Sequence, residues 1–247
     1  MLTGQCLTNA LVDELNEMGL TTMAVALETL YKSDRFLKLD RLTIISEIIQ
    51  AEYQDKITKR LKNSLKRAHL EGAPEEICKC EDSATREYLP ATITDTLSSL
   101  AFISEGMNVC ILGPSDSGKT YLAKALGIAA CEKYRVAYWH CEDLIEFLAS
   151  LKDDNHSKYE RKMKYFKNLD LLVLDDFLLH TITDEKEIKV LYTILENRCE
   201  ACKSTIVCSQ REPNSWKSMV LNDEISANSI MKRATRHYTV VINVKNG

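Results

Sequence analysis

Hydrophobic residues in the first part of the chain recur at a helical spacing. One series consists of Leu7, Leu11, Leu15 and Met18, and a longer series follows it. Apolar residues three or four positions apart lie on the same face of a helix. The pattern therefore predicts an N-terminal helical domain over residues 1–75.

The pattern changes near Pro90, where short apolar runs begin to alternate with helix-length segments. The apolar runs lie near residues 107–112, 135–140, 170–174, 204–209 and 238–244. This alternation is typical of βαβ units. Residues 93–247 are therefore predicted to form an α/β domain, with a mainly parallel five-stranded sheet between two layers of helices. Proline and acidic residues before this domain predict a linker over residues 76–92.

The first predicted strand leads into a glycine-containing segment that carries a phosphate-binding motif. The segment consists of Gly113, Pro114, Ser115, Asp116, Ser117, Gly118, Lys119 and Thr120, followed by Tyr121. It matches G-x-x-x-x-G-K-[ST] between a strand and a helix, the context that this motif requires. Backbone N–H groups of the loop would surround the phosphates of ATP, Lys119 would reach the β- and γ-phosphates, and Thr120 would bind Mg²⁺. Asp116 is an unusual carboxylate in such a loop, and it either points to solvent or weakens nucleotide affinity.

A second apolar run ends in two adjacent carboxylates, Asp175 and Asp176. Strands of parallel sheets bind ligands at their carboxyl ends, so these side chains are expected near the phosphate-binding loop. Asp175 would hold Mg²⁺ through water, and Asp176 would orient or deprotonate the attacking water. RecA-like ATPases instead place a glutamate after the second strand, where this chain has Glu142. We favour Asp176, because the aspartate pair already supplies both carboxylates.

Two further polar positions are candidates for sensing the γ-phosphate. The strand near residues 204–209 ends in Ser209 and Gln210, and its tip is predicted to lie between the two phosphate-site strands. We assign the sensing role to Ser209, with an ordinary loop residue as the equal alternative. Arg233, just before the last strand, could reach the γ-phosphate of a neighbouring subunit as an arginine finger, with Arg236 as the second candidate. A basic helix end that complements the helix dipole is the simpler explanation of both arginines.

Composition limits where nucleic acid could bind. The formal net charge is −4, so DNA binding would need local basic patches. Two clusters of lysine and arginine, within residues 55–70 and 158–167, are candidates. For the first cluster a solvated helix face is the default interpretation, and a contact with DNA or a transposase is the alternative. Contacts through these clusters would be made to the DNA backbone and would be independent of sequence.

The N-terminal residues and the cysteines predict a cytoplasmic protein with reduced thiols and no membrane partner. Acidic residues near the N-terminus argue against a secretory signal, and no apolar run is long enough to span a membrane. The nine cysteines follow no pattern of secreted domains. Cys199 and Cys202 have the spacing of zinc ligands, but no second pair with that spacing accompanies them, so we expect no zinc site.

Over nearly its whole length the chain resembles the IstB-like ATPases, helper proteins of insertion-sequence transposition that are close to DnaC-type helicase loaders. The resemblance rests on the helical N-terminal region, the run from Gly106 to Pro114, Leu171–Phe177, Ser204–Gln210 and Trp216. It implies a P-loop NTPase of the AAA+ type with two helices inserted after the second strand. It also implies an ATP-dependent homo-oligomer on duplex DNA that captures a transposase, with Arg233 as the finger arginine.

The chain departs from this family's pattern at Asp116 and Leu178, where glycine is usual or frequent, and at Lys232, where aspartate is usual. The family's tail after the last strand is missing, so we expect no C-terminal lid and closure of the nucleotide site by a neighbouring subunit. The leading hypothesis is an ATP-hydrolysing protein that assists a transposase in target selection. A loader of a replicative helicase and a DNA-binding scaffold that hardly hydrolyses ATP are the alternatives, and Asp116 is the argument for the scaffold.

Overall fold

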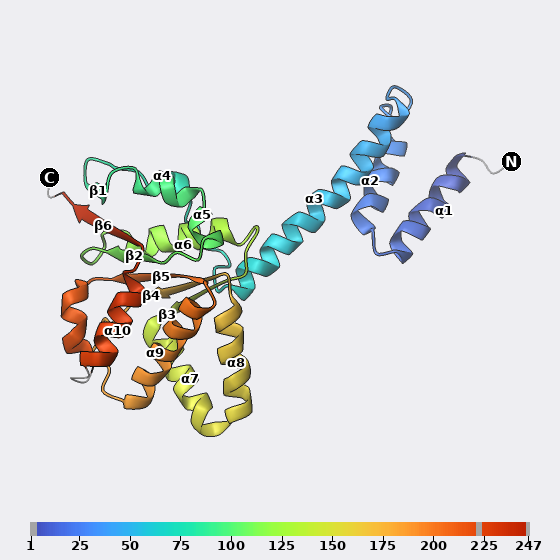
Figure 1. Ribbon diagram of the computed structural model, residues 1–247. Coiled ribbons are helices and arrows are strands. Elements are labelled where there is room, and N and C mark those ends of the chain that lie inside the picture. The colour runs from blue at the N-terminus through green and yellow to red at the C-terminus, as the bar shows by residue number, and fades with distance from the viewer. Residues whose placement is uncertain (1–3, 221–223, 246–247) are drawn as a thin grey trace. The chain divides into compact units, whose positions relative to one another are not determined.

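The computed structural model describes residues 4–220 and 224–245 and divides the chain into two compact units, Met1–Asn63 and Ser64–Gly247 (Figure 1). The outermost residues of the predicted domains, 1–3 and 246–247, lie outside the described residues. No helix in the described part of the chain is long and apolar enough to cross a membrane.

The first unit is helical, as the spacing of apolar residues predicts. It contains α1 (Gly4–Glu17), α2 (Thr21–Tyr31) and most of α3 (Arg41–Arg67). Gly19 has a φ of 72° between α1 and α2, a left-handed conformation that glycine adopts without steric cost. The buried carboxylate of Glu52 on α3 accepts a hydrogen bond from Met23 N (2.9 Å), which satisfies a free N–H group in the first turn of α2.

The second unit is built on a six-stranded sheet with the order β1-β6-β2-β5-β4-β3. The strands are β1 (Arg86–Leu89), β2 (Val109–Leu112), β3 (Val136–His140), β4 (Leu171–Asp175), β5 (Ser204–Ser209) and β6 (Tyr238–Val244). All neighbouring strands are parallel except β1 and β6. The mainly parallel sheet is therefore confirmed, with one strand more than the five predicted.

The additional strand, β1, lies within the segment that was expected to be a linker. It pairs in antiparallel fashion with β6 at the edge of the sheet, and it carries the charged residues Arg86 and Glu87. An edge strand needs no continuous apolar run, and a strand of four residues has too few positions for a clear alternation. This segment is therefore part of the α/β unit.

Helices cover both faces of the sheet and complete three layers (Figure 1). The helical segments of this unit are η1 (Ile77–Lys79), α4 (Ile93–Ser98), α5 (Ala101–Ser104), α6 (Lys119–Ala130), α7 (Cys141–Asp154), α8 (His156–Asn168), α9 (Glu185–Glu200), η2 (Pro213–Met219) and α10 (Glu224–Ala234). Figure 1 shows α6 on one face of the sheet and α7 to α10 on the other. The two helices expected after the second predicted strand are α7 and α8.

The central strands form the core of the unit. Every residue of β2, β4 and β5 is buried, which agrees with the continuous apolar runs in their sequences. Trp216 is completely buried and packs edge-on against Phe177, with ring centroids 5.0 Å apart. The segments after β4 and β5 are thereby held against each other at the carboxyl edge of the sheet.

Candidate nucleotide-binding site

The strand order brings the predicted phosphate residues together. Strand β5 lies between β2 and β4, as the sequence predicted, so the carboxyl ends of these three strands are neighbours. A cavity of about 360 Å³ opens at this edge. Its lining residues are Ser115, Asp116, Gly118, Lys119, Thr120, Tyr121, Asp176 and Gln210. Three segments that are distant in the sequence therefore contribute to one cavity.

The loop after β2 has a backbone that only particular residues allow. A Cβ atom on Gly113 would lie 2.6 Å from Ser117 Oγ and 2.7 Å from Ile242 O, so no side chain fits there. Gly118 has a φ of 98°, and α6 begins at the next residue. The first N–H groups of a helix have no partner within the helix and carry its positive dipole end. This arrangement suits the phosphate groups of a nucleotide.

Lys119 lies at the base of this loop with its side chain largely buried. Its Nζ donates a hydrogen bond to Pro114 O at 2.6 Å, and the residue is only 6% exposed. Burial lowers the pKa of Lys119, and the nearby Cys208 and the two carboxylates, Asp175 and Asp176, oppose this shift. An ammonium group has three donors, so donors remain for phosphate oxygens.

The two carboxylates after β4 differ in their surroundings. Asp175 is 1% exposed, and its oxygens accept hydrogen bonds from Tyr138 Oη (2.6 Å) and from the backbone N–H of Asp176 (3.0 Å). Burial, and after it the bond to Asp175, raises the pKa of Tyr138, which therefore stays a proton donor. Asp176 has a positive φ of 50°, and its side chain is 37% exposed and lies 3.2 Å from His140 Nδ1. Asp175 is thus fixed, whereas Asp176 is accessible from the cavity.

Oxygen donors for Mg²⁺ are available at the same edge. Thr120 contributes a hydroxyl group to the cavity, and each carboxylate oxygen of Asp175 keeps lone pairs after accepting one hydrogen bond. Hydroxyl and carboxylate oxygens are the ligands that Mg²⁺ prefers, together with water and substrate phosphates. The residues present therefore fit a magnesium ion that arrives with a nucleotide.

Glu142, the alternative catalytic carboxylate, lies at the start of α7 and is engaged elsewhere. It accepts hydrogen bonds from His180 N (3.2 Å) and contacts the ring nitrogen Nδ1 of the same residue at 2.8 Å. Among the described residues, those that line the phosphate cavity do not include Glu142. The geometry therefore favours Asp176 over Glu142.

The assignment of a sensing role to Ser209 needs correction. Its side chain is buried, and its hydroxyl donates to Phe177 O (2.8 Å) and accepts from Arg211 N (3.2 Å). This hydroxyl ties the end of β5 to the segment after β4, so it is not directed to the cavity. Gln210, the next residue, lines the cavity and is the polar side chain at the strand tip.

Arg233 lies on α10 in a different cavity. That cavity is lined by Glu196, Cys199, Glu200, Lys232, Arg233 and Arg236. Arg233 forms an ion pair with Glu196 and lies over the ring of Tyr192, 5.2 Å from its centroid. Arg233 does not line the phosphate cavity, so its role as a finger stays a prediction.

Arg86 on β1 was not identified from the sequence. Its Cζ lies 2.9 Å from the position that a Cβ atom on Gly118 would occupy, so the guanidinium group lies against the start of α6. The segment before β1 also contacts α6, because Glu76 N donates a hydrogen bond to Tyr121 Oη at 3.2 Å. No motif marks Arg86, since it belongs to the short edge strand that the sequence pattern does not predict.

Comparison with known sequences supports the nucleotide site. The model of a family described as IstB-like ATP binding protein matches residues 13–247. A putative insertion sequence ATP-binding protein of Sinorhizobium fredii is 30% identical over 219 residues, which cover 87% of this chain and 86% of that protein. A putative ATP-binding protein of insertion sequence IS232 from Bacillus thuringiensis is 35% identical over 144 residues, 58% of this chain and 56% of its own length.

Solved structures with a similar fold are replication proteins. A replication initiator DnaA bound to AMPPCP and single-stranded DNA has a TM-score of 0.55 and 19% identity, covering 70% of this chain and 51% of that chain. AMPPCP-bound DnaA from Aquifex aeolicus has a TM-score of 0.52 and 24% identity, covering 62% of this chain and 46% of that chain. At these identities the likeness establishes the fold.

Proposed function

Since this chain belongs to the family of IstB-like ATP-binding proteins, we propose that it hydrolyses MgATP, assembles with further copies on DNA and assists a transposase in target selection. The observation that carries the proposal is the convergence of the phosphate-binding loop, the aspartate pair and Gln210 at one edge of the sheet. The core has the AAA+ fold of DnaA.

Each residue of the site has a role that follows from its position. Backbone N–H groups of residues 113–118 and the start of α6 hold the phosphates, and Lys119 neutralises part of their charge. Thr120 and Asp175 would hold Mg²⁺, which neutralises charge on the phosphates when MgATP is bound. Asp176 orients the attacking water or accepts its proton, because it is the member of the aspartate pair that lines the cavity. Gln210 is placed to sense the γ-phosphate.

A neighbouring subunit would supply a further positive charge at the γ-phosphate. Arg233 does not line the phosphate cavity of its own subunit, and in the described residues it is paired with Glu196. At a subunit boundary this pair would open, and the guanidinium group would contact the γ-phosphate of the neighbour. Hydrolysis is then coupled to assembly, because one subunit alone lacks the finger.

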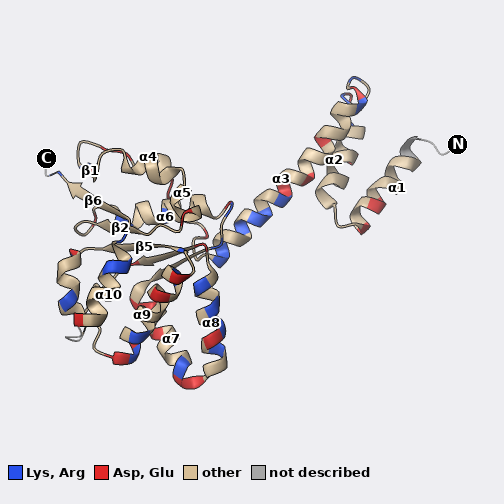
Figure 2. Cartoon of the chain, viewed as in Figure 1, with Lys and Arg blue, Asp and Glu red and all other residues tan. Residues whose placement is uncertain are grey.

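DNA contacts would be made by the basic helices. Lys and Arg gather along α8 and on the second half of α3 (Figure 2). The lysines and arginines of α8 are Lys158, Arg161, Lys162, Lys164 and Lys167. Such clusters bind the phosphate backbone and do not distinguish base sequence. The names of the sequence relatives, which are insertion sequence ATP-binding proteins, favour a transposase as the protein partner.

Two alternatives follow from particular observations. The likeness of the fold to replication initiators leaves open a loader of a replicative helicase. Asp116 lines the phosphate cavity beside Lys119, and a carboxylate there favours a scaffold that binds ATP weakly and hardly turns it over. Turnover of ATP that increases with DNA would exclude the scaffold, and stimulation by a purified transposase but not by a replicative helicase would exclude the loader.

The test of the nucleotide site is the variant Lys119→Ala. Loss of a buried ammonium group that contacts two phosphates should weaken ATP binding by at least about 100-fold. Binding is measured by calorimetric titration with a slowly hydrolysed ATP analogue and Mg²⁺. Lys133→Ala removes an exposed lysine just after α6 and is the matched control. Unchanged affinity in Lys119→Ala, with the fold intact by circular dichroism, would refute the assigned site.

A further inference from the structure

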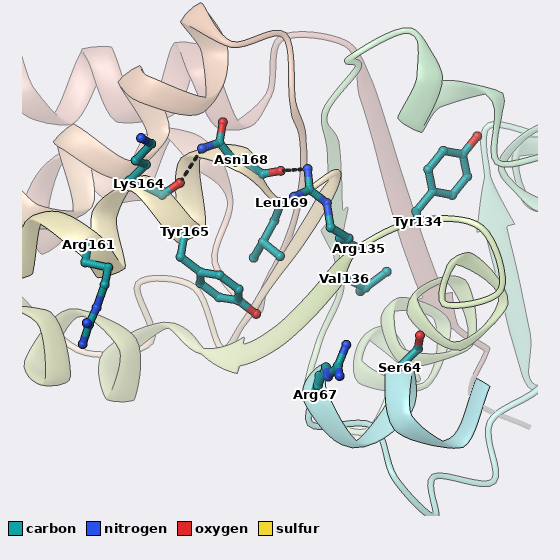
Figure 3. A pocket seen from close by; sticks show the side chains of 10 residues that line it. All are labelled: Ser64, Arg67, Tyr134, Arg135, Val136, Arg161, Lys164, Tyr165, Asn168 and Leu169. Atoms are coloured by element: carbon teal, nitrogen blue, oxygen red, sulfur yellow. Dashed lines mark hydrogen bonds between the residues drawn. The ribbon is translucent and has the colours of Figure 1, made fainter. Parts of the chain in front are cut away.

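A third cavity lies at the opposite edge of the sheet, where β3 and β4 begin. It has a volume of about 400 Å³ (Figure 3). Its lining residues are Ser64, Arg67, Tyr134, Arg135, Val136, Arg161, Lys164, Tyr165, Asn168 and Leu169. They come from the end of α3, the start of β3 and the second half of α8. We refer to this cavity as the basic pocket.

The basic pocket concentrates positive charge without a carboxylate in its lining. Its cations are Arg67, Arg135, Arg161 and Lys164. Within residues 4–220 and 224–245, no carboxylate lies within ion-pair distance of Arg67, Arg161 or Lys164. Like charges at this spacing repel one another, so an anionic ligand would stabilise the arrangement.

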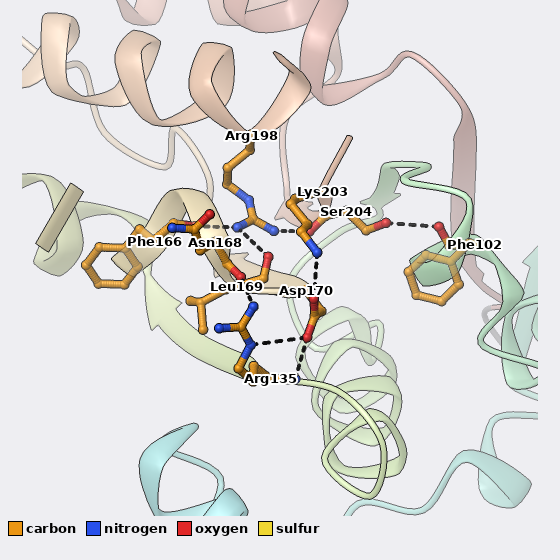
Figure 4. Close-up of polar contacts among 9 residues, drawn as sticks. All are labelled: Phe102, Arg135, Phe166, Asn168, Leu169, Asp170, Arg198, Lys203 and Ser204. Carbon is orange, nitrogen blue, oxygen red and sulfur yellow. Dashed lines mark hydrogen bonds and ion pairs between the residues drawn. The ribbon is translucent and has the colours of Figure 1, made fainter. Parts of the chain in front are cut away.

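The fourth cation, Arg135, is held in a fixed position by its neighbours (Figure 4). Its Nη2 donates to Asn168 O at 2.6 Å, and its Nε lies 3.5 Å from Asp170 Oδ2. Asp170 in turn accepts bonds from the Arg135 backbone N–H (3.0 Å) and from Lys203 Nζ (2.7 Å). Asp170 is therefore shared by Arg135 and Lys203.

The walls of the pocket are anchored to the core. Arg198 is buried and donates hydrogen bonds to the carbonyl oxygens of Phe166 and Leu169 (3.0 Å for Leu169), which fixes the end of α8 (Figure 4). On the other side, Ala68 O accepts a hydrogen bond from Tyr138 N at 2.8 Å, and Ala68 is fully buried. Arg67 is next to this anchor, so its backbone position is defined.

Aromatic and apolar groups complete the lining. Tyr165 is 44% exposed, and Figure 3 shows its ring beside Leu169. Burial raises the pKa of Tyr165, so its hydroxyl stays protonated near neutral pH. Tyr134 also lines the pocket, but its ring points away from Tyr165 (Figure 3). An aromatic ring next to arginines offers stacking for a nucleobase and donors for its phosphate.

We propose that the basic pocket binds one nucleoside phosphate unit, either as a free nucleotide or as part of an unpaired nucleic-acid strand. The base would stack on Tyr165, and the phosphate would be held by Arg161, which lies one helical turn before Tyr165 on α8. A cavity of this size belongs to the range of small-ligand sites and does not admit a duplex. The site is separate from the ATP site, so the proposal holds or fails independently of ATP hydrolysis.

A solvated basic face is the competing explanation, and it accounts for only part of the lining. Basic residues in the last turn of a helix complement its dipole, which explains Lys66 and Arg67 at the end of α3. Arg161 lies in the middle of α8, where that explanation does not apply. Nor does it account for Tyr165, an exposed aromatic ring that lines the same pocket.

The experiment measures binding of a fluorescent oligothymidylate of about ten nucleotides to the full chain by anisotropy. Tyr165→Leu removes the ring, and we expect it to weaken binding by about tenfold or more. Tyr165→Phe keeps the ring and should weaken binding by less than about threefold. Arg161→Gln should weaken binding and reduce the slope of log affinity against log salt by about 0.7. Lys158→Gln removes an exposed cation of the same helix that does not line the pocket, and it should have a clearly smaller effect.

Thymidine monophosphate as a competitor distinguishes the two sources of the ligand. Displacement of the oligonucleotide by the monophosphate supports a site for free nucleotides, whereas dependence on Tyr165 without such displacement supports a strand. Equal effects of Arg161→Gln and Lys158→Gln, together with no effect of Tyr165→Leu, would overturn the proposal. Retained ATP-analogue affinity and an unchanged melting temperature show that each variant is folded.

Discussion

The phosphate cavity and the basic pocket of the α/β unit attract anions by different means. At the carboxyl edge of the sheet, the cavity is lined by the glycine-containing loop and the start of α6, and one buried lysine adds a full charge. At the amino edge, the basic pocket relies on side chains of three separate elements. A loop of backbone donors is rigid and close-fitting, whereas long cationic side chains adapt to ligands of different shape.

The phosphate cavity and the basic pocket also differ in whether carboxylates are present. Asp175 and Asp176 lie at the carboxyl edge, so that site can hold a metal ion and activate water. The lining of the basic pocket contains no carboxylate among the described residues. We therefore expect chemistry at the first site and only binding at the second.

The largest expected effect concerns Arg233, which does not line the phosphate cavity of its own chain. Arg233→Ala should lower ATP turnover by about 10³–10⁵-fold, the range measured for arginine fingers, while ATP binding to the monomer is kept. Turnover is measured by phosphate release with DNA present. Arg236→Ala, one turn away and in the same cavity, is the control. If Arg236→Ala alone abolished turnover, the finger would be Arg236.

Mixing two inactive variants tests whether the site is shared. Arg233→Ala keeps an intact phosphate-binding loop, and Lys119→Ala keeps an intact finger. Their mixture can form subunit boundaries that combine both, so part of the turnover should return. Full activity of Arg233→Ala alone, with no recovery at any ratio, would show that hydrolysis takes place within one subunit.

The basic-pocket variant Arg161→Gln should leave ATP affinity unchanged, which checks that the two cavities are independent.

The next effect concerns water activation at the carboxyl edge. Asp176→Asn removes the accessible carboxylate and should lower turnover by about 10²–10⁴-fold, with ATP binding retained. Glu142→Gln is the control, because Glu142 contacts His180 instead of the cavity. Turnover of both variants is compared at saturating ATP. Normal turnover in Asp176→Asn and loss in Glu142→Gln would assign catalysis to Glu142, as in RecA-like ATPases.

The phosphate site could be predicted from the sequence because its parts are contiguous or follow buried strands. The loop of residues 113–120 is an uninterrupted motif, and the aspartate pair ends a run of apolar residues. Parallel packing of these strands then brings both to the same edge. The choice between Ser209 and Gln210 is different. The sequence does not show which of these two adjacent polar residues faces the cavity at the end of the strand, and the sensing role was assigned to the one whose hydroxyl is bonded to Phe177 O.

The basic pocket could not be predicted as a unit. Two basic clusters were recognised, but Arg135 belongs to neither, and the approach of α3, β3 and α8 depends on tertiary packing. The strand β1 was missed because it is short, charged and at the sheet edge. Arg86 belongs to that strand, so its position beside Gly118 was also beyond a reading of local patterns.

Arg86 provides the smallest predicted effect, and it tests whether the phosphate site depends on backbone donors alone. A cation at the amino end of α6 is unfavourable for the helix dipole, so its position there is better explained by a phosphate that it contacts. Arg86→Gln should weaken ATP binding by about three- to tenfold, a modest loss because the group is partly exposed.

Two matched variants serve as controls for Arg86→Gln. Arg86→Lys keeps the charge and should recover part of the affinity, whereas Glu87→Gln changes the next residue of the same edge strand and should leave ATP affinity unchanged. Affinities are determined by calorimetric titration with the ATP analogue, alongside melting temperatures. Equal losses in Arg86→Gln and Glu87→Gln, with lowered melting temperatures in both, would mean that β1 supports the loop only through the sheet. A selective loss in Arg86→Gln would show that the nucleotide site, like the basic pocket, uses a side-chain cation from a distant strand.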